Sequence, residues 1–203
     1  METIFRMTIT DWSIFVLALG PFAPLIVGLV KQKDPSQTFL TWVLYLLLDV
    51  ITMFSNIEVG PHGYAMLFGF VVGSFIMSMI LLYQGRFARW SWIETITITL
   101  ITICILIWKL GGPFWALIAG ITSETIVGLY LIIRTFRDPI VEYNLAGYSG
   151  FLFVSIFTII TAQEWTLSEV GFAISETFLN ILILIPLFRK RKNEKGKSFY
   201  RIS

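Results

Sequence analysis

Three acidic residues lie inside long apolar segments, and they are the strongest candidates for chemistry in this sequence. Asp49, Glu124 and Glu176 each stand in a stretch that is otherwise largely hydrophobic. An ionised carboxylate at the centre of a bilayer costs about 2.5–3.5 kcal/mol on insertion scales, so it needs a partner, a proton or a water-filled cavity. A medium of low dielectric favours the neutral form of an acid. All three residues are therefore candidates for proton coupling, or alternatively for hydrogen bonds that hold neighbouring helices together.

Polar residues at helical spacing extend this set. Asn180 follows Glu176 by four residues, so both side chains project from one face of a helix. Ser74 and Ser78 have the same spacing in an earlier apolar segment. Such pairs can bind a polar solute, although a serine in a membrane helix often donates to a carbonyl oxygen of its own helix instead.

The residue types argue against enzymatic and metal chemistry. The single cysteine, Cys104, and the single histidine, His62, exclude an intramolecular disulfide, a cysteine-based metal site and the His-rich zinc motifs. There is no HExxH motif, no paired aspartate motif with flanking glycines, and no Ser/His pair at membrane depth. We therefore expect a protein that is not an enzyme and that holds no cofactor and no metal ion.

The segments that position these side chains are those of an all-α membrane protein. The 203 residues are 56% hydrophobic and only 14% charged, and the mean hydropathy is +0.80. A soluble domain carries roughly 25% charged residues, so a water-soluble globule is excluded. A bilayer core of about 30 Å needs about 20 apolar residues per helix. This predicts seven transmembrane helices, at residues 12–30, 38–54, 63–83, 92–110, 113–133, 144–161 and 167–188.

The basic residues predict the orientation of these helices. Thirteen of the 15 lysines and arginines fall in alternate connecting segments and in the tail at 189–203, and only Arg6 and Lys109 lie on the other side. Because retained basic residues mark the cytoplasmic side, we expect the N-terminus outside and the C-terminus in the cytoplasm. The localisation expected is multi-pass in the plasma (inner) membrane, in contact with lipid and without nucleic acid.

The helix ends also predict how deep the acids lie. At a rise of 1.5 Å per residue, Glu124 lies about 16 Å and Glu176 about 14 Å from the outer ends of their helices. Both are then near the middle of the membrane. Asp49 lies about 8 Å from the outer end of its helix, which predicts a shallower position.

An internal repeat groups the seven helices. A shift of 100 residues aligns 26–29 with 126–129, both Ile-Val-Gly-Leu, and a shift of 102 aligns Gly69-Phe70 with Gly171-Phe172. The second shift also aligns Ser74 with Glu176 and Ser78 with Asn180. We expect two parallel three-helix units at residues 1–83 and 113–188, joined by a linker helix at 92–110 and followed by a basic cytoplasmic tail at 189–203.

This 3+1+3 plan resembles the SWEET and PQ-loop superfamily of small transporters. The signature of that family is a Pro-Gln pair late in the first helix of each unit, where this chain has Pro24-Leu25 and Glu124-Thr125. The resemblance implies a substrate site between the units, with polar contacts from the third helix of each unit. It also favours a hinge at the prolines of the first helix, Pro21 and Pro24. The substrate-binding residues that it implies are Ser74, Ser78, Glu176 and Asn180.

These observations predict a transporter of small solutes. It would work by alternating access around a central polar cavity, with proton coupling through the interior acids. The alternatives are a seven-helix receptor for a ligand or cargo, a sensor, or an accessory subunit of a larger membrane complex. A retinal protein is excluded, because the last apolar segment has no lysine before Lys190. The GxxxG spacing of Gly69 and Gly73 is compatible with a homodimer.

Overall fold

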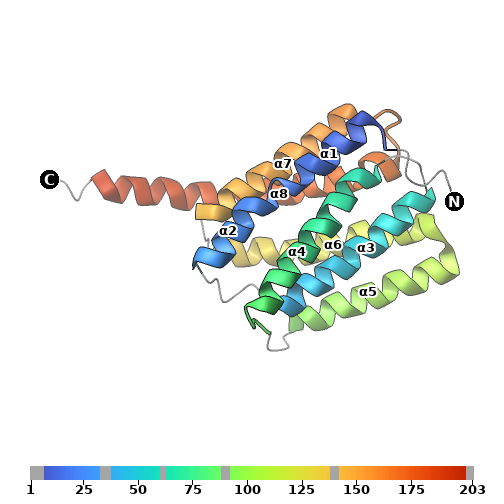
Figure 1. Cartoon of the computed structure of the whole chain (residues 1–203), viewed down its shortest axis with the longest axis horizontal. Helices are drawn as coiled ribbons and strands as arrows, with labels where there is room; N and C mark the ends of the chain where they lie inside the picture. Colours follow the sequence, from blue (N-terminus) through green and yellow to red (C-terminus); the bar gives the residue numbers. More distant parts are fainter. Residues whose placement is uncertain (1–6, 33–37, 60–62, 88–91, 138–141, 200–203) are drawn as a thin grey trace.

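Helices make up the whole regular structure of the described residues. The computed structural model describes residues 7–32, 38–59, 63–87, 92–137 and 142–199 (Figure 1). Seven segments in these ranges are long and apolar enough to cross a membrane, which confirms the prediction of an all-helical, multi-pass membrane protein. The first of these segments consists of two helices. The helices are α1 (Ile9–Leu19), α2 (Phe22–Gln32), α3 (Phe39–Val59), α4 (Tyr64–Tyr83), α5 (Trp92–Gly111), α6 (Pro113–Arg137), α7 (Glu142–Thr161) and α8 (Leu167–Phe199).

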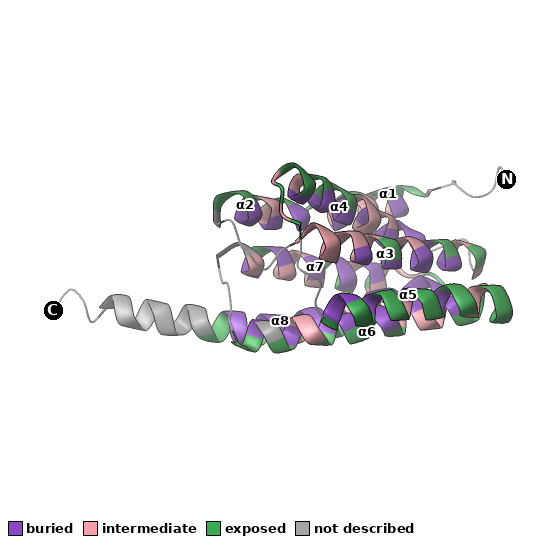
Figure 2. Ribbon diagram, turned by 90° about the horizontal axis from the view of Figure 1, so that it is seen from below, coloured by how far each residue is buried: buried purple, intermediate pink, exposed green. Residues whose placement is uncertain are grey.

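The helices run along a common axis in one elongated bundle (Figure 1). Helix α4 packs against both α1 and α3, and α8 packs against both α6 and α7. These two groups meet where α3 contacts α6 and where α2 contacts α7, while α5 lies against α3 and α6. Many residues of α5 are exposed (Figure 2). Large apolar residues such as Ile105, Phe153 and Phe178 are exposed on the outside, as a surface in contact with lipid requires.

The two ends of the bundle differ in charge. Helices α2, α4 and α6 finish at the end where α3, α5 and α7 begin, and α8 continues past it (Figure 1). This end, called the basic end below, has Lys31, Arg86 and Arg137 at or beside helix termini, and Arg189 where the membrane-spanning part of α8 ends. The opposite end, where α1 begins, is called the far end.

The first crossing is broken in the middle, where the sequence predicts one kinked helix at 12–30. Helix α1 ends at Leu19 and α2 begins at Phe22, so Gly20 and Pro21 form a turn between them. Proline has no N–H to donate, but Pro24 lies in the first turn of α2, where that group has no partner within the helix. Helix α7 approaches closely here, since a Cβ on its Gly150 would lie 2.9 Å from Cγ of Pro21.

Two helices extend beyond the predicted ends. Helix α3 continues to Val59 instead of ending near residue 54, because its polar residues Ser55 and Asn56 are fully buried inside the bundle. Nδ2 of Asn56 donates to the carbonyl oxygen of Ser168 in α8 at 2.6 Å. Helix α8 runs on to Phe199 through the segment predicted as a tail, because lysine, arginine and glutamate are good helix formers.

The far half of the bundle is filled by a hydrophobic core. We call this cluster the far-end core; it joins α1, α3, α4, α7 and α8. Its buried members are Ile14, Ala18, Met53, Tyr64, Ala65, Met66, Leu67, Val154, Phe172 and Ala173. The buried side chains of this core pack between the described helices at this level.

Gly69 and Gly73 serve packing inside the chain. A Cβ on Gly69 would stand 2.5 Å from Cβ of Ala18 in α1, and one on Gly73 would overlap the ring of Phe22 in α2. Both glycines are needed because α4 lies so close to the first crossing. Their spacing therefore gives no support to a homodimer.

Replacing Gly69 by alanine should lower the thermal stability of the protein in detergent. The added methyl group would collide with Ala18, and overpacking of this kind costs about 1–3 kcal/mol. Gly111→Ala is the matched control, because a Cβ there would meet its nearest neighbours at 3.5 Å. We expect the melting temperature of G69A to lie several degrees below that of G111A. Equal melting temperatures would contradict the close packing of α4 on α1.

Candidate functional site

A cavity of about 370 Å³ occupies the half of the bundle nearer the basic end. Its walls come from the first half of α3, the first turns of α5, the second half of α6, and parts of α2, α4, α7 and α8. The far-end core lies beyond it, so the described wall extends from the middle of the bundle to the helix ends at the basic end. This volume falls within the range of sites that enclose small organic ligands, about 300–1,000 Å³.

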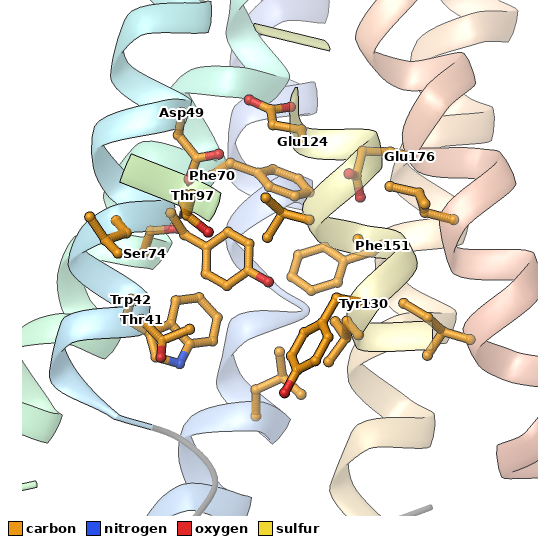
Figure 3. A pocket seen from close by; sticks show the side chains of 18 of the residues that line it. Thr41, Trp42, Asp49, Phe70, Ser74, Thr97, Glu124, Tyr130, Phe151 and Glu176 are labelled. Carbon is orange, nitrogen blue, oxygen red and sulfur yellow. Dashed lines mark hydrogen bonds between the residues drawn. The ribbon is translucent and has the colours of Figure 1, made fainter. Parts of the chain in front are cut away.

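The three acids predicted from the sequence meet at the closed end of this cavity. Asp49 comes from α3, Glu124 from α6 and Glu176 from α8, and all three line the cavity wall (Figure 3). Asp49 is deeper than predicted, because α3 continues to Val59 and places it about 15 Å from that end. It therefore lies at about the same depth as the two glutamates.

Two of the acids are hydrogen-bonded to predicted site residues. The hydroxyl of Ser74 donates to Oδ2 of Asp49 at 2.8 Å, which links α4 to α3. Nδ2 of Asn180 donates to Oε2 of Glu176 at 3.0 Å and to the carbonyl oxygen of the same residue at 2.7 Å. Each of these carboxyl groups keeps further acceptor positions for a bound solute.

Glu124 has no such partner. Its side chain is 8% exposed, and neither carboxylate oxygen has a hydrogen-bond partner. The hydroxyl of Thr52 donates instead to the carbonyl oxygen of Leu48 at 3.0 Å. One turn before Glu124, a Cβ on Gly120 would overlap the side chain of Thr52, so only glycine allows α3 and α6 to meet there. This contact closes the cavity immediately beyond the acids.

The other predicted residues lie outside the cavity. Ser78 is fully buried, and its hydroxyl donates to the carbonyl oxygen of Ser74 at 2.8 Å; it is not among the described residues of the wall. Pro21 and Pro24 are also outside the wall, although their neighbours Phe22 and Leu25 form part of it.

Aromatic side chains, which the sequence analysis did not assign to a site, form much of the wall (Figure 3). The ring of Phe151 lies 4.9 Å from that of Phe70 and 5.0 Å from that of Phe22, measured between centroids. Trp42 lies near the start of α3, where a tryptophan commonly sits at the membrane surface, yet here it lines the cavity nearer the basic end. The sequence did contain a signal for this position. Trp42, Tyr45 and Asp49 recur at intervals of three and four residues, which places them on one face of a helix.

A fourth acid, Glu94, was also missed. It lies in the first turn of α5 and lines the cavity toward the basic end. Oγ1 of Thr41 in α3 donates to its Oε1 at 3.0 Å. Glu94 belongs to a row of buried residues in α5 spaced three or four apart: Glu94, Thr97, Ile101 and Cys104. This periodicity in the sequence could have identified the inward face of the helix.

The electrostatic character of the wall is therefore acidic and aromatic. Among the described residues that line the cavity, four are acidic and none is a lysine, arginine or histidine. Within the same described ranges, no three acidic, histidine or cysteine side chains are grouped closely enough to hold a metal ion.

No protein-family model, curated protein or solved structure matches the chain.

Replacing Glu124 by glutamine should leave the melting temperature unchanged or raise it. The substitution removes an unpartnered buried acid and breaks no hydrogen bond. Glu169→Gln is the contrasting variant, because that carboxylate accepts from the backbone N–H groups of Gln163 and Glu164 at 2.6 Å each. Since hydrogen bonds to charged groups contribute about 1.5–3 kcal/mol each, E169Q should unfold several degrees earlier. An equal loss of stability in E124Q would assign Glu124 a structural role.

Proposed function

We propose that the protein is a membrane transporter of small solutes that works by alternating access around this cavity. The observation that supports this most strongly is the one-sided cavity, with carboxyl groups at its closed end in the middle of the bundle and a hydrophobic core beyond them. A solute can reach the acids from the basic end without crossing that core. By the positive-inside rule, the basic end faces the cytoplasm, with the plasma (inner) membrane as the proposed location.

The proposed architecture consists of two parallel three-helix units joined by α5. The first unit contains α1 with α2, α3 and α4, and the second contains α6, α7 and α8. In each unit the third helix contacts both others, and between units the second helix of one meets the first helix of the other. This exchange is expected for a pseudo-two-fold axis along the membrane normal. It supports the resemblance to the SWEET and PQ-loop superfamily.

Alternating access requires the far-end core to open while the cavity closes. Two features of the bundle bear on such a movement, a contact that must break and a break that can bend. The hydrogen bond from Asn56 in α3 to Ser168 in α8 joins the two proposed units at the far end. The break at Gly20 and Pro21 divides the first crossing into a part that packs in the far-end core, through Ala18, and a part that lines the cavity, through Phe22. The break is therefore the proposed hinge.

Proton coupling is part of the same proposal. Asp49, Glu124 and Glu176 line the space that a solute would occupy. A carboxyl group there can release a proton when it binds a cationic or hydrogen-bonding solute and recover it when the solute leaves. The acids are thus the groups through which transport would be linked to the proton gradient.

Cysteine labelling tests alternating access without knowledge of the solute. The native thiol, Cys104, is fully buried and can be replaced by serine. In that background, Thr41→Cys should react with a membrane-impermeant maleimide added at the basic end. Met66→Cys, in the far-end core, should react slowly with reagent added at the far end, because it becomes accessible only when that end opens.

The control for reagent access at the far end is Leu110→Cys, since Leu110 lies in the last turn of α5 and is 87% exposed. It should react rapidly in the same vesicles. A Met66→Cys variant that never reacts while Leu110→Cys does would contradict alternating access and would favour a receptor with a one-sided binding site.

A further inference from the structure

We infer that the solute of this cavity is an organic cation, an amine with an apolar body whose ammonium group binds among Asp49, Glu124 and Glu176. The inference concerns binding, and it rests on the proposed function only for the step from binding to transport. The charges, the unsatisfied hydrogen-bond acceptors and the aromatic surfaces of the cavity wall indicate this class of solute.

The first support is the sign of the charge. The described residues of the wall include three carboxyl groups at the closed end, those of Asp49, Glu124 and Glu176, and no lysine, arginine or histidine. A cavity lined by one sign of charge between walls of low dielectric concentrates ions of the opposite sign. Such a wall attracts cations and repels anions such as carboxylates and phosphates.

The second, independent support is the unsatisfied state of Glu124. This side chain is more than nine-tenths buried, lines the cavity, and has no hydrogen-bond partner for either oxygen. A buried acid without a partner is costly for the fold. An ammonium group has three donors and no acceptor, so it can supply the hydrogen-bond donor that Glu124 lacks.

The rest of the cavity wall indicates what kind of molecule bears the positive charge. Beside the acids stand the rings of Phe70 and Phe151, and nearer the basic end those of Trp42 and Tyr130 (Figure 3). Aromatic faces attract cations within about 6 Å and also cover an apolar body. A hydrated inorganic cation would leave these rings unused, and the described acids are not grouped as the ligands of one metal ion. The volume of about 370 Å³ accommodates an amine with one ring.

Three ligands of similar shape and different charge provide the test. They are 2-phenylethylamine, a cation; 2-phenylethanol, which is neutral; and 3-phenylpropionate, an anion. Binding to the purified protein in detergent is measured by isothermal titration calorimetry at neutral pH. We expect the amine to bind at least about tenfold more tightly than the alcohol and the carboxylate not to bind.

Two variants locate the binding site. Glu124→Gln and, independently, Glu176→Gln should each weaken binding of the amine by about tenfold or more, and each is first checked for an unchanged melting profile. Glu58→Gln is the matched control. It removes the same charge from an exposed side chain at the far end, whose Oε2 accepts from Nε1 of Trp108, and it should bind the amine as the wild type does.

Three results would overturn the inference. They are equal affinities for the amine and the alcohol, the same loss of binding in E58Q and E124Q, or no binding of 2-phenylethylamine or spermidine up to about 10 mM. The labelling experiment tests the proposed function independently of this inference. If the amine binds as expected while Met66→Cys stays unreactive, the protein binds cations without alternating access. If Met66→Cys reacts but no amine binds, alternating access remains supported and the solute belongs to another class.

Discussion

The cost of placing a carboxyl group in the middle of a membrane is the constraint on which the rest of the structure depends. Three acids from three helices lie at one depth, and one of them, Glu124, has no partner within the protein. Glu124 lines the cavity, and Ser74 and Asn180 donate hydrogen bonds to the other two acids. The acids therefore lie at the level where the interior of the bundle is hollow on one side.

Close helix contacts explain why the same interior is closed on the other side. Gly120 lets α6 approach Thr52 of α3 directly beyond Glu124, and Gly69 lets α4 approach α1 beside the far-end core. A larger residue at either position would separate helices at the level where the cavity ends. The level at which the cavity ends is therefore set by two kinds of residue. The glycines bring helices together on one side of it, and the acids require space between helices on the other.

Hydropathy was sufficient to predict seven crossings and the three acids, because both signals are local in the sequence. The depth of Asp49 was not predicted, because Ser55 and Asn56 look like the beginning of a loop when their burial against α8 is unknown. Hydropathy also assigns aromatic residues such as Trp42 to the membrane without saying whether they face lipid or a cavity. Ser74 and Ser78 have equivalent spacing, yet only Ser74 reaches the cavity, since Ser78 donates to its own helix. Which of the two serines reaches the cavity depends on the rotation of α4 relative to its neighbouring helices.

The most direct test of the central claim, that the acids form one ligand-accessible site at the closed end of a one-sided cavity, is a cryo-electron microscopy map in lipid nanodiscs with and without 2-phenylethylamine. We expect the added density to lie among Asp49, Glu124 and Glu176, with the amine pointing toward Glu124 and the ring against Phe70 or Phe151. A map in which Glu124 is bound to a neighbouring helix, and in which no density enters the cavity, would contradict the claim.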